Sequence, residues 1–115
     1  MVQVVTDETF EQEVVQSDIP CVLDFHAQWC QPCKDLAPVF GELSAEYEGR
    51  VKFCSIDSEA NRALRIRFAV AVLPFIVWTC DGTKTALFDQ SVPKEKLRER
   101  IDYMLAGREA PSFKL

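Results

Sequence analysis

The chain has 115 residues, of which 48% are hydrophobic and 27% charged, and its formal net charge is −5. This composition predicts one soluble globular domain with its own core, and the length is too short for two domains. The acidic balance, without a basic stripe, argues against nucleic acid as a partner. No apolar run approaches the ~20 residues of a membrane span, and the first residues lack a secretory pattern, so we expect a cytoplasmic protein.

The first part of the chain alternates between strand-like and helix-like stretches. Residues 2–5 are an apolar run that predicts a first strand, and Thr6 then suits the N-cap of a helix, with Asp7 in its first turn. Residues 21–26 are apolar almost throughout, which is typical of a central strand covered on both faces. The apolar stripe of the intervening helix consists of Phe10, Val14 and Val15.

A longer helix follows the central strand and extends to about Glu48. Pro38 interrupts it, because an interior proline removes one hydrogen bond of the helix. Gly49 then fits the position at which a helix stops. The apolar residues of this helix repeat at intervals of three and four and are Leu36, Val39, Phe40, Leu43 and Tyr47.

The next stretch predicts a third strand over residues 51–56 and a short helix over residues 63–68, with Leu64 and Phe68 facing inward. Pro74 lies at the head of a further strand that continues to Trp78. A proline belongs at the first position of a strand, since it has no N–H group to donate to the ladder.

The chain closes with a hairpin and a helix. Asp81-Gly82 is a hairpin-turn signature, and residues 86–88 return as an edge strand. Pro93 suits the first position of a last helix that ends at Gly107. The apolar stripe of this helix consists of Leu97, Ile101, Met104 and Leu105.

This order of elements predicts an α/β fold with a central mixed β-sheet flanked by helices on both faces. The hairpin would form the edge of the sheet. We assign residues 1–107 to the domain and residues 108–115 to a C-terminal tail without a recognisable pattern.

Two cysteines lie at the turn between the central strand and the long helix. Cys30 and Cys33 are separated by two residues, so they can close and reopen a small disulfide ring. Cys30 falls where a helix N-terminus presents unpaired N–H groups and partial positive charge, which favour the thiolate. Cys33, about one turn further on, is near enough to attack a mixed disulfide formed at Cys30. The pair therefore predicts dithiol redox chemistry.

Two other interpretations of this pair are a static disulfide and half of a zinc site. A structural zinc site with four cysteines needs a second close pair, whereas Cys21, Cys54 and Cys80 are scattered singly. We therefore expect no zinc, and no cofactor besides the redox-active disulfide itself. Cys21 and Cys54 read as small core residues, and Cys80 as a more exposed thiol at the hairpin that is open to oxidation.

One acidic residue stands inside the central strand. Asp24 is costly to bury as a carboxylate, which favours a role in proton transfer over simple local pairing.

The run from Val22 to Lys34, which contains Trp29-Cys30-Gln31-Pro32-Cys33, resembles the active-site region of the thioredoxin family. Leu73-Pro74 resembles the family's cis-proline, where an ordinary trans proline is the alternative, and Asp81-Gly82 resembles its hairpin turn. The match is ungapped from about Val5 to Leu105. The resemblance implies the thioredoxin fold and a protein-disulfide reductase.

The resemblance also implies roles for individual residues. Cys30 would be the attacking nucleophile, Cys33 the resolving thiol, and Asp24 the buried carboxylate that moves a proton for Cys33. Pro74 would face the disulfide. The substrate-binding surface would consist of Trp29, Gln31, Pro32, Leu73 and Pro74. The implied partners are disulfide-containing proteins and a thioredoxin reductase, and we expect a monomer.

The chain departs from the family pattern at several positions that bear on redox poise, reductase and substrate range. His26 replaces a tryptophan, Gln31 a glycine, Phe75 a common threonine and Ser55 a lysine near the buried aspartate; a glycine is missing near Gln90. We expect His26 to modulate the site, by coupling its charge to the Cys30 thiolate or by filling part of the tryptophan's space.

Two further functions stay open from the sequence. One is an oxidant or isomerase with a shifted potential, because about 30 mV already corresponds to ~1.4 kcal/mol for a two-electron couple. The other is a binding module or chaperone subunit in which the cysteines are idle, although intact Cys30, Cys33, Asp24 and Pro74 argue against it.

Overall fold

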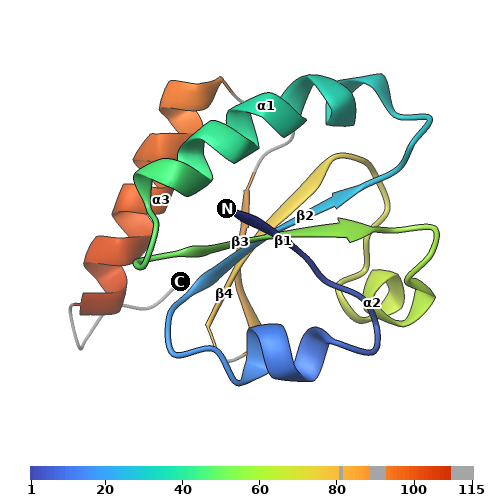
Figure 1. The fold of residues 1–115 in the computed structure, drawn as a ribbon, viewed down its shortest axis with the longest axis horizontal. Helices are drawn as coiled ribbons and strands as arrows, with labels where there is room; N and C mark the ends of the chain where they lie inside the picture. The colour runs from blue at the N-terminus through green and yellow to red at the C-terminus, as the bar shows by residue number, and fades with distance from the viewer. Residues whose placement is uncertain (81, 89–92, 110–115) are drawn as a thin grey trace.

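The structure is a computed structural model that describes residues 1–80, 82–88 and 93–109. A central sheet separates two layers of helices (Figure 1). The elements in chain order are β1 (Val2–Val4), η1 (Glu11–Val15), β2 (Cys21–His26), α1 (Gln31–Glu46), β3 (Lys52–Asp57), α2 (Arg62–Arg67), β4 (Phe75–Cys80), β5 (Thr83–Phe88) and α3 (Lys94–Glu109).

The sheet has five strands in the order β1-β3-β2-β4-β5. Strands β1, β3 and β2 run parallel, whereas β4 and β5 pair antiparallel to their neighbours. Strand β2 is therefore central, and β5 forms an edge, as the sequence predicts. The expected α/β fold with a mixed sheet and helices on both faces is confirmed.

Successive residues of β2 point to opposite faces of the sheet, and both faces are covered. Val22 belongs to the core between the sheet and the helices α1 and α3, which includes Phe40, Trp78 and Ile101. Leu23 and Phe25 belong to the core on the other face. That second core includes Phe10, Val14, Cys54, Ile56, Leu64 and Phe68. By the same alternation, Asp24 and His26 lie on the α1 face.

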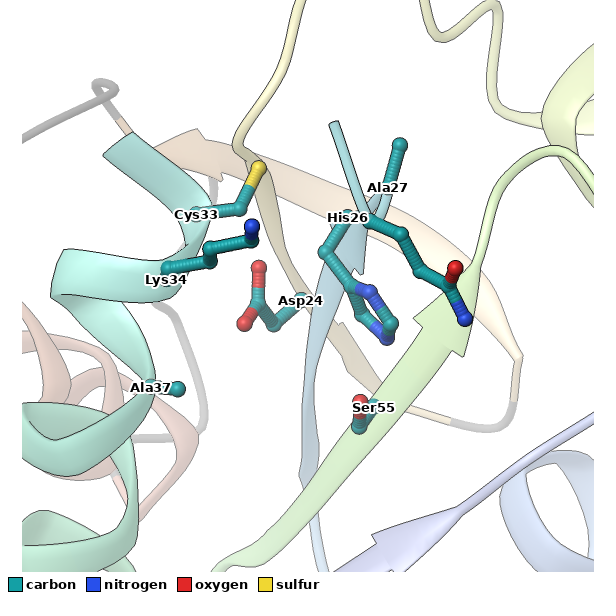
Figure 2. Close-up of a pocket in the computed structure, with 8 residues that line it drawn as sticks. Asp24, His26, Ala27, Cys33, Lys34, Ala37 and Ser55 are labelled. Carbon is teal, nitrogen blue, oxygen red and sulfur yellow. The ribbon is translucent and has the colours of Figure 1, made fainter. Parts of the chain in front are cut away.

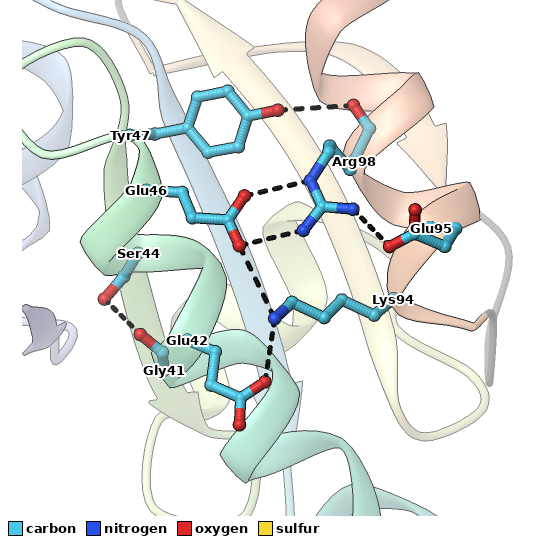
Figure 3. A network of polar contacts seen from close by, with 8 residues as sticks. All are labelled: Gly41, Glu42, Ser44, Glu46, Tyr47, Lys94, Glu95 and Arg98. Carbon is cyan, nitrogen blue, oxygen red and sulfur yellow. Dashed lines mark hydrogen bonds and ion pairs between the residues drawn. The ribbon is translucent and has the colours of Figure 1, made fainter.

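Polar contacts join the outer parts of α1 and α3 (Figure 3). The Arg98 guanidinium donates from Nε and Nη2 to the two carboxylate oxygens of Glu46, at 2.9 and 2.8 Å, and also contacts Glu95. Lys94 Nζ lies 2.9 Å from Glu42 and 3.4 Å from Glu46. These exposed pairs fix the orientation of α3 more than they add stability.

The first helix differs from the sequence prediction. The helix η1 covers only five residues, with π-type bonding such as the Gln16 N–H to the Glu11 carbonyl, 3.0 Å. The prediction that Thr6 caps this segment is wrong: the N-cap residue of η1 is Phe10, without a side-chain cap hydrogen bond, and the Thr6 hydroxyl accepts the N–H of Thr9 at 3.2 Å in the turn before it. Asp7 serves another helix: its carboxylate accepts the N–H groups of Leu64 and Ala63 at the start of α2, at 3.0 and 3.3 Å.

Several predicted boundaries shift by one to three residues. Helix α1 ends at Glu46 rather than Glu48, because the N–H groups of Arg50 and Val51 turn back to the Tyr47 carbonyl. Gly49 still adopts the left-handed conformation, with φ +83°. Helix α3 extends past Gly107 to Glu109.

The proline-led elements begin one residue later than predicted. Strand β4 starts at Phe75, directly after Pro74. Helix α3 starts at Lys94, and the Pro93 carbonyl accepts the first helical bond from Leu97 at 3.0 Å. Strand β5 is longer than the predicted residues 86–88. The turn residue Asp81, Gln90 and residues 110–115 of the predicted tail lie outside the described residues.

No helix in the described part of the chain is long and apolar enough to span a membrane.

Candidate active site

Cys30 and Cys33 form a disulfide at the start of α1, with their Cα atoms 5.3 Å apart. Cys30 is the N-cap residue, and its backbone is extended (φ −91°, ψ 105°). Its Sγ accepts the N–H of Cys33 at 3.2 Å, so a sulfur occupies the place that a serine or aspartate oxygen takes in an ordinary N-cap. Gln31 and Pro32 occupy the first two helical positions, where a proline's missing N–H costs no hydrogen bond.

The segment before β4 packs against this disulfide. The Leu73–Pro74 peptide bond is cis, as the resemblance implies, and Pro74 is buried. Leu73 is half-buried and packs on the small cluster formed by Ala27, Cys30 and Cys33. The fold thus brings together two motifs that are 40 residues apart in the sequence.

Asp24 is almost completely enclosed, with 4% of its surface exposed. Its Oδ1 has no hydrogen-bond partner among the described residues. Burial penalises the charged form and raises the pKa of the Asp24 carboxyl to about 7. A group with this pKa exchanges protons near neutral pH, which is what a general base for a thiol requires.

A cavity of about 520 Å³ connects Asp24 with Cys33. His26, Gln28, Lys34 and Ser55 also line it. Figure 2 shows Asp24 and His26 projecting from β2 into this space, with Cys33 and Lys34 on α1 opposite and Ser55 on β3. His26 thus lies on the Cys33 side of the disulfide, since Cys30 is not among the residues that line the cavity.

Trp29 stands on the outer side of the disulfide and is 67% exposed. Its indole Nε1 donates to Glu59 Oε2 at 2.7 Å, which fixes the orientation of the ring. Trp29 and Leu73 line a shallow hollow of about 160 Å³ together with Ser58, Glu59, Arg65 and Val72. An exposed apolar ring with a polar rim is typical of a docking surface.

Gln31 and Pro32 are exposed beside this surface. The Gln31 side chain donates to Asp35 Oδ1 at 2.9 Å, one turn along α1. All the predicted substrate-binding residues therefore lie near the disulfide: Trp29, Gln31 and Pro32 at the start of α1, and Leu73 and Pro74 before β4.

The remaining cysteines are free thiols. Cys21 and Cys54 are buried in the core, as predicted, whereas Cys80 is half-buried. Within the described residues, no group of three or more potential metal ligands comes together.

A family model described as Thioredoxin matches residues 1–103. The chain belongs to the thioredoxin family. Thioredoxin of Haemophilus influenzae is 39% identical over 98 residues, which cover 85% of this chain and 92% of that protein. Thioredoxin 1 of Nostoc sp. is 35% identical over 98 residues, which cover 85% of this chain and 92% of that protein. Thioredoxin C-2 of Corynebacterium nephridii is 36% identical over 97 residues, covering 84% and 90%.

Membership of the thioredoxin family confirms the predicted resemblance and reaction class. Thioredoxins are thiol–disulfide oxidoreductases that catalyse dithiol–disulfide exchange, and this chain carries the required pair as the Cys30–Cys33 disulfide. The thioredoxin reaction uses no cofactor beyond these cysteines.

Sequence reasoning missed two features of this thioredoxin site. Glu59, which holds Trp29, lies 30 residues away in the chain and carries no motif. The cavity behind the disulfide also depends on tertiary structure, although the replacements at His26 and Ser55 were visible in the sequence and both face it.

Proposed function

We propose that this protein reduces disulfide bonds of other proteins, with Cys30 as the nucleophile and Cys33 as the resolving thiol. The observation that carries this proposal is the N-cap position of Cys30, whose Sγ accepts the N–H of Cys33 at 3.2 Å. In the reduced protein, the same N–H group and the positive end of the α1 dipole favour the Cys30 thiolate. Cys33 lies inside the first turn and faces the cavity of Asp24 instead.

The proposed cycle moves two electrons from the dithiol to the substrate. The Cys30 thiolate attacks one sulfur of the substrate disulfide, and the other sulfur leaves as a thiolate. Cys33 then loses its proton to Asp24 and attacks Sγ of Cys30. This step closes the Cys30–Cys33 disulfide and releases the second substrate thiolate. Water protonates both substrate thiolates, and a dithiol reductant regenerates the enzyme.

Asp24 suits the role of proton acceptor for Cys33. It is buried behind the disulfide, its pKa of about 7 allows it to accept a proton reversibly, and it shares a cavity with Cys33. A carboxyl with an ordinary pKa near ~4 would be a much weaker base.

The proposed partners are protein disulfides and a thioredoxin reductase, and we propose a monomeric cytoplasmic protein. Three free cysteines support a reducing compartment, because disulfides accumulate in oxidising ones. The exposed Trp29 ring, with Gln31, Pro32, Leu73 and Pro74 around the disulfide, supports docking of an extended polypeptide segment.

Insulin reduction with dithiothreitol as the final reductant tests this proposal. The native protein should accelerate the precipitation of insulin B chain, and Cys30→Ser should not. An inactive native protein would favour the binding-module interpretation. Activity with a thioredoxin reductase and NADPH in place of dithiothreitol tests the proposed reductase.

A further inference from the structure

The cavity beside β2 raises the question of how Asp24 exchanges its proton with solvent. Asp24 is 4% exposed, and its register partner on β4 is the fully buried Ile76. The cavity of about 520 Å³ offers a route out, and it is large enough to hold several water molecules. A residue that lines this cavity and also reaches solvent is therefore positioned to carry the proton.

His26 meets both conditions. It lies two residues after Asp24 on β2, on the same face of the strand, and its side chain lines the cavity. It is half-buried, whereas every other residue of β2 is buried. Figure 2 shows its ring between Asp24 and the carboxyl end of β3, near Ser55. Ser55, which is the register partner of Asp24, adds a hydroxyl that both donates and accepts.

We propose that His26 is the proton-exchange group of this site, which transfers the proton of Asp24 to solvent through water in the cavity. This inference rests on the proposed function, because it completes the step in which Asp24 takes the proton of Cys33. The protonated Asp24 carboxyl gives its proton through water to an imidazole nitrogen of His26. The imidazolium then releases a proton to bulk solvent, and no electron moves in this step.

The chemistry of the two groups fits such an exchange. Histidine is the side chain that ordinarily takes up and releases protons near neutral pH. Burial raises the pKa of Asp24 to about 7, so its carboxyl both takes up and releases a proton near neutral pH.

The charged side chains that face His26 come from α1 and β3, and they are Lys34 and Asp57. Lys34, which faces the cavity from α1, is a cation and favours the carboxylate of Asp24. Asp57 is the register partner of His26 on β3, but its Oδ1 accepts the N–H groups of Glu59 and Ala60, at 2.9 and 3.3 Å. Cys33 on α1 is the source of the proton.

The test follows both thiol steps with the chromogenic disulfide 5,5′-dithiobis(2-nitrobenzoic acid). Attack by Cys30 releases the first thionitrobenzoate, and resolution by Cys33 releases the second. At about pH 6, where Asp24 begins protonated, His26→Ala and His26→Gln should slow the second release roughly tenfold, a modest part of the ~10²–10⁴ contributed by a positioned base. At about pH 8, where Asp24 is already a carboxylate, both variants should match the native protein.

Two controls separate proton transfer from packing. Gln28→Ala, which changes another residue of the same cavity, should leave both phases unchanged. Free imidazole should restore the second phase of His26→Ala at about pH 6, but not that of the double variant Asp24→Asn/His26→Ala.

Equal second phases in native protein and His26 variants at both pH values would overturn the inference. So would a slow phase that neither imidazole nor pH alters, because that outcome assigns His26 a packing role. Release of only one thionitrobenzoate by the native protein would instead contradict the proposed function.

Discussion

Two pairs of cysteines lie on or next to β2, and only one of them has the geometry of a redox centre. Cys30 and Cys33 follow the carboxyl end of the strand, with Cα atoms 5.3 Å apart on one helical turn. Cys21 begins the strand, and Cys54 lies on β3, two register positions beyond the partner of Cys21. Two residues of offset across neighbouring strands separate Cα atoms by about 8 Å, beyond the ~7 Å that a disulfide spans.

The thiols of the second pair nevertheless interact. A hydrogen bond with Cys54 lowers the pKa of Cys21 to about 7, and the same bond together with burial raises the pKa of Cys54. Cys21 also donates to the Ile19 carbonyl at 3.8 Å. Cys21 is nevertheless only 1% exposed, so reagents and substrates in solution do not reach its sulfur.

This difference shows which features the redox centre needs besides two thiols. Cys30 lies at a helix N-terminus, Cys33 faces a carboxyl with a raised pKa, and an exposed aromatic ring stands beside the pair. Cys21 and Cys54 are instead buried in the core, with 1% and 0% of their surface exposed. The following predictions remove these features one at a time.

The largest effect is expected from the cysteines themselves. Cys30→Ser should reduce insulin reduction to the uncatalysed rate, because it removes the proposed nucleophile, whereas Cys54→Ser should leave the rate unchanged. Cys33→Ser should accumulate mixed disulfides visible on non-reducing gels. Mixed disulfides in Cys30→Ser instead would reverse the two roles.

Asp24→Asn should stabilise the protein at high pH. The pKa of Asp24 is about 7 instead of 3.8, so the folded state binds this proton more tightly than the unfolded chain does. Its carboxyl therefore costs stability as pH rises from about 4 to about 7, and the cost is constant above that range. The variant should gain up to about 4 kcal/mol in unfolding free energy at about pH 8, and almost nothing at about pH 3.

Urea unfolding of both proteins at the two pH values measures this difference. A gain that is equal at both would show that the effect comes from packing of the amide rather than from the buried charge.

The same substitution should slow catalysis at one step. Asp24→Asn removes the proposed proton acceptor for Cys33, so resolution should slow by about 10²-fold while the attack by Cys30 changes little. Stopped-flow kinetics separates the two steps. If both steps slow equally, Asp24 acts on the site as a whole and not on Cys33.

A smaller effect is expected from the docking surface. Glu59→Ala removes the acceptor of the Trp29 indole, 2.7 Å away, and frees the ring to rotate. Loss of one such hydrogen bond is worth ~1 kcal/mol, so KM for protein substrates should rise several-fold with kcat unchanged. Glu48→Ala, at an exposed glutamate two residues beyond the end of α1, is the matched control. A fall in kcat would place Glu59 closer to the chemistry.

The smallest effect is expected at the pair in the core. Mild oxidation should form the Cys30–Cys33 disulfide only, and alkylation of the folded reduced protein should leave Cys21 and Cys54 unlabelled. Peptide mapping by mass spectrometry after labelling identifies both the disulfide formed and the cysteines that are alkylated. A Cys21–Cys54 disulfide in folded protein would mean that β2 and β3 change register.

The parts of the site predicted from the sequence are those that local chemistry determines. The cysteines, the helix start and the proline before β4 each occupy a position that their own short motif indicates. Asp24 was also predictable, since an acid within an apolar strand is conspicuous.

Contacts between distant segments were not predictable in this way. Asp7 was expected to serve the helix that follows it, but it caps α2, more than 50 residues later. Nothing in the sequence around Glu59 distinguishes it from other exposed glutamates as the partner of Trp29. The contact of Cys21 with Cys54 depends on the register of β2 and β3. A single sequence contains no information on these pairings beyond propensity.

Helix α1 has a discontinuity at Pro38, which has no N–H to donate to the carbonyl of Lys34. The turn before it carries the reactive disulfide, and the part after it is tied to α3 through Glu42 and Glu46 (Figure 3). One backbone hydrogen bond is therefore missing between the segment that carries the disulfide and the segment that contacts α3.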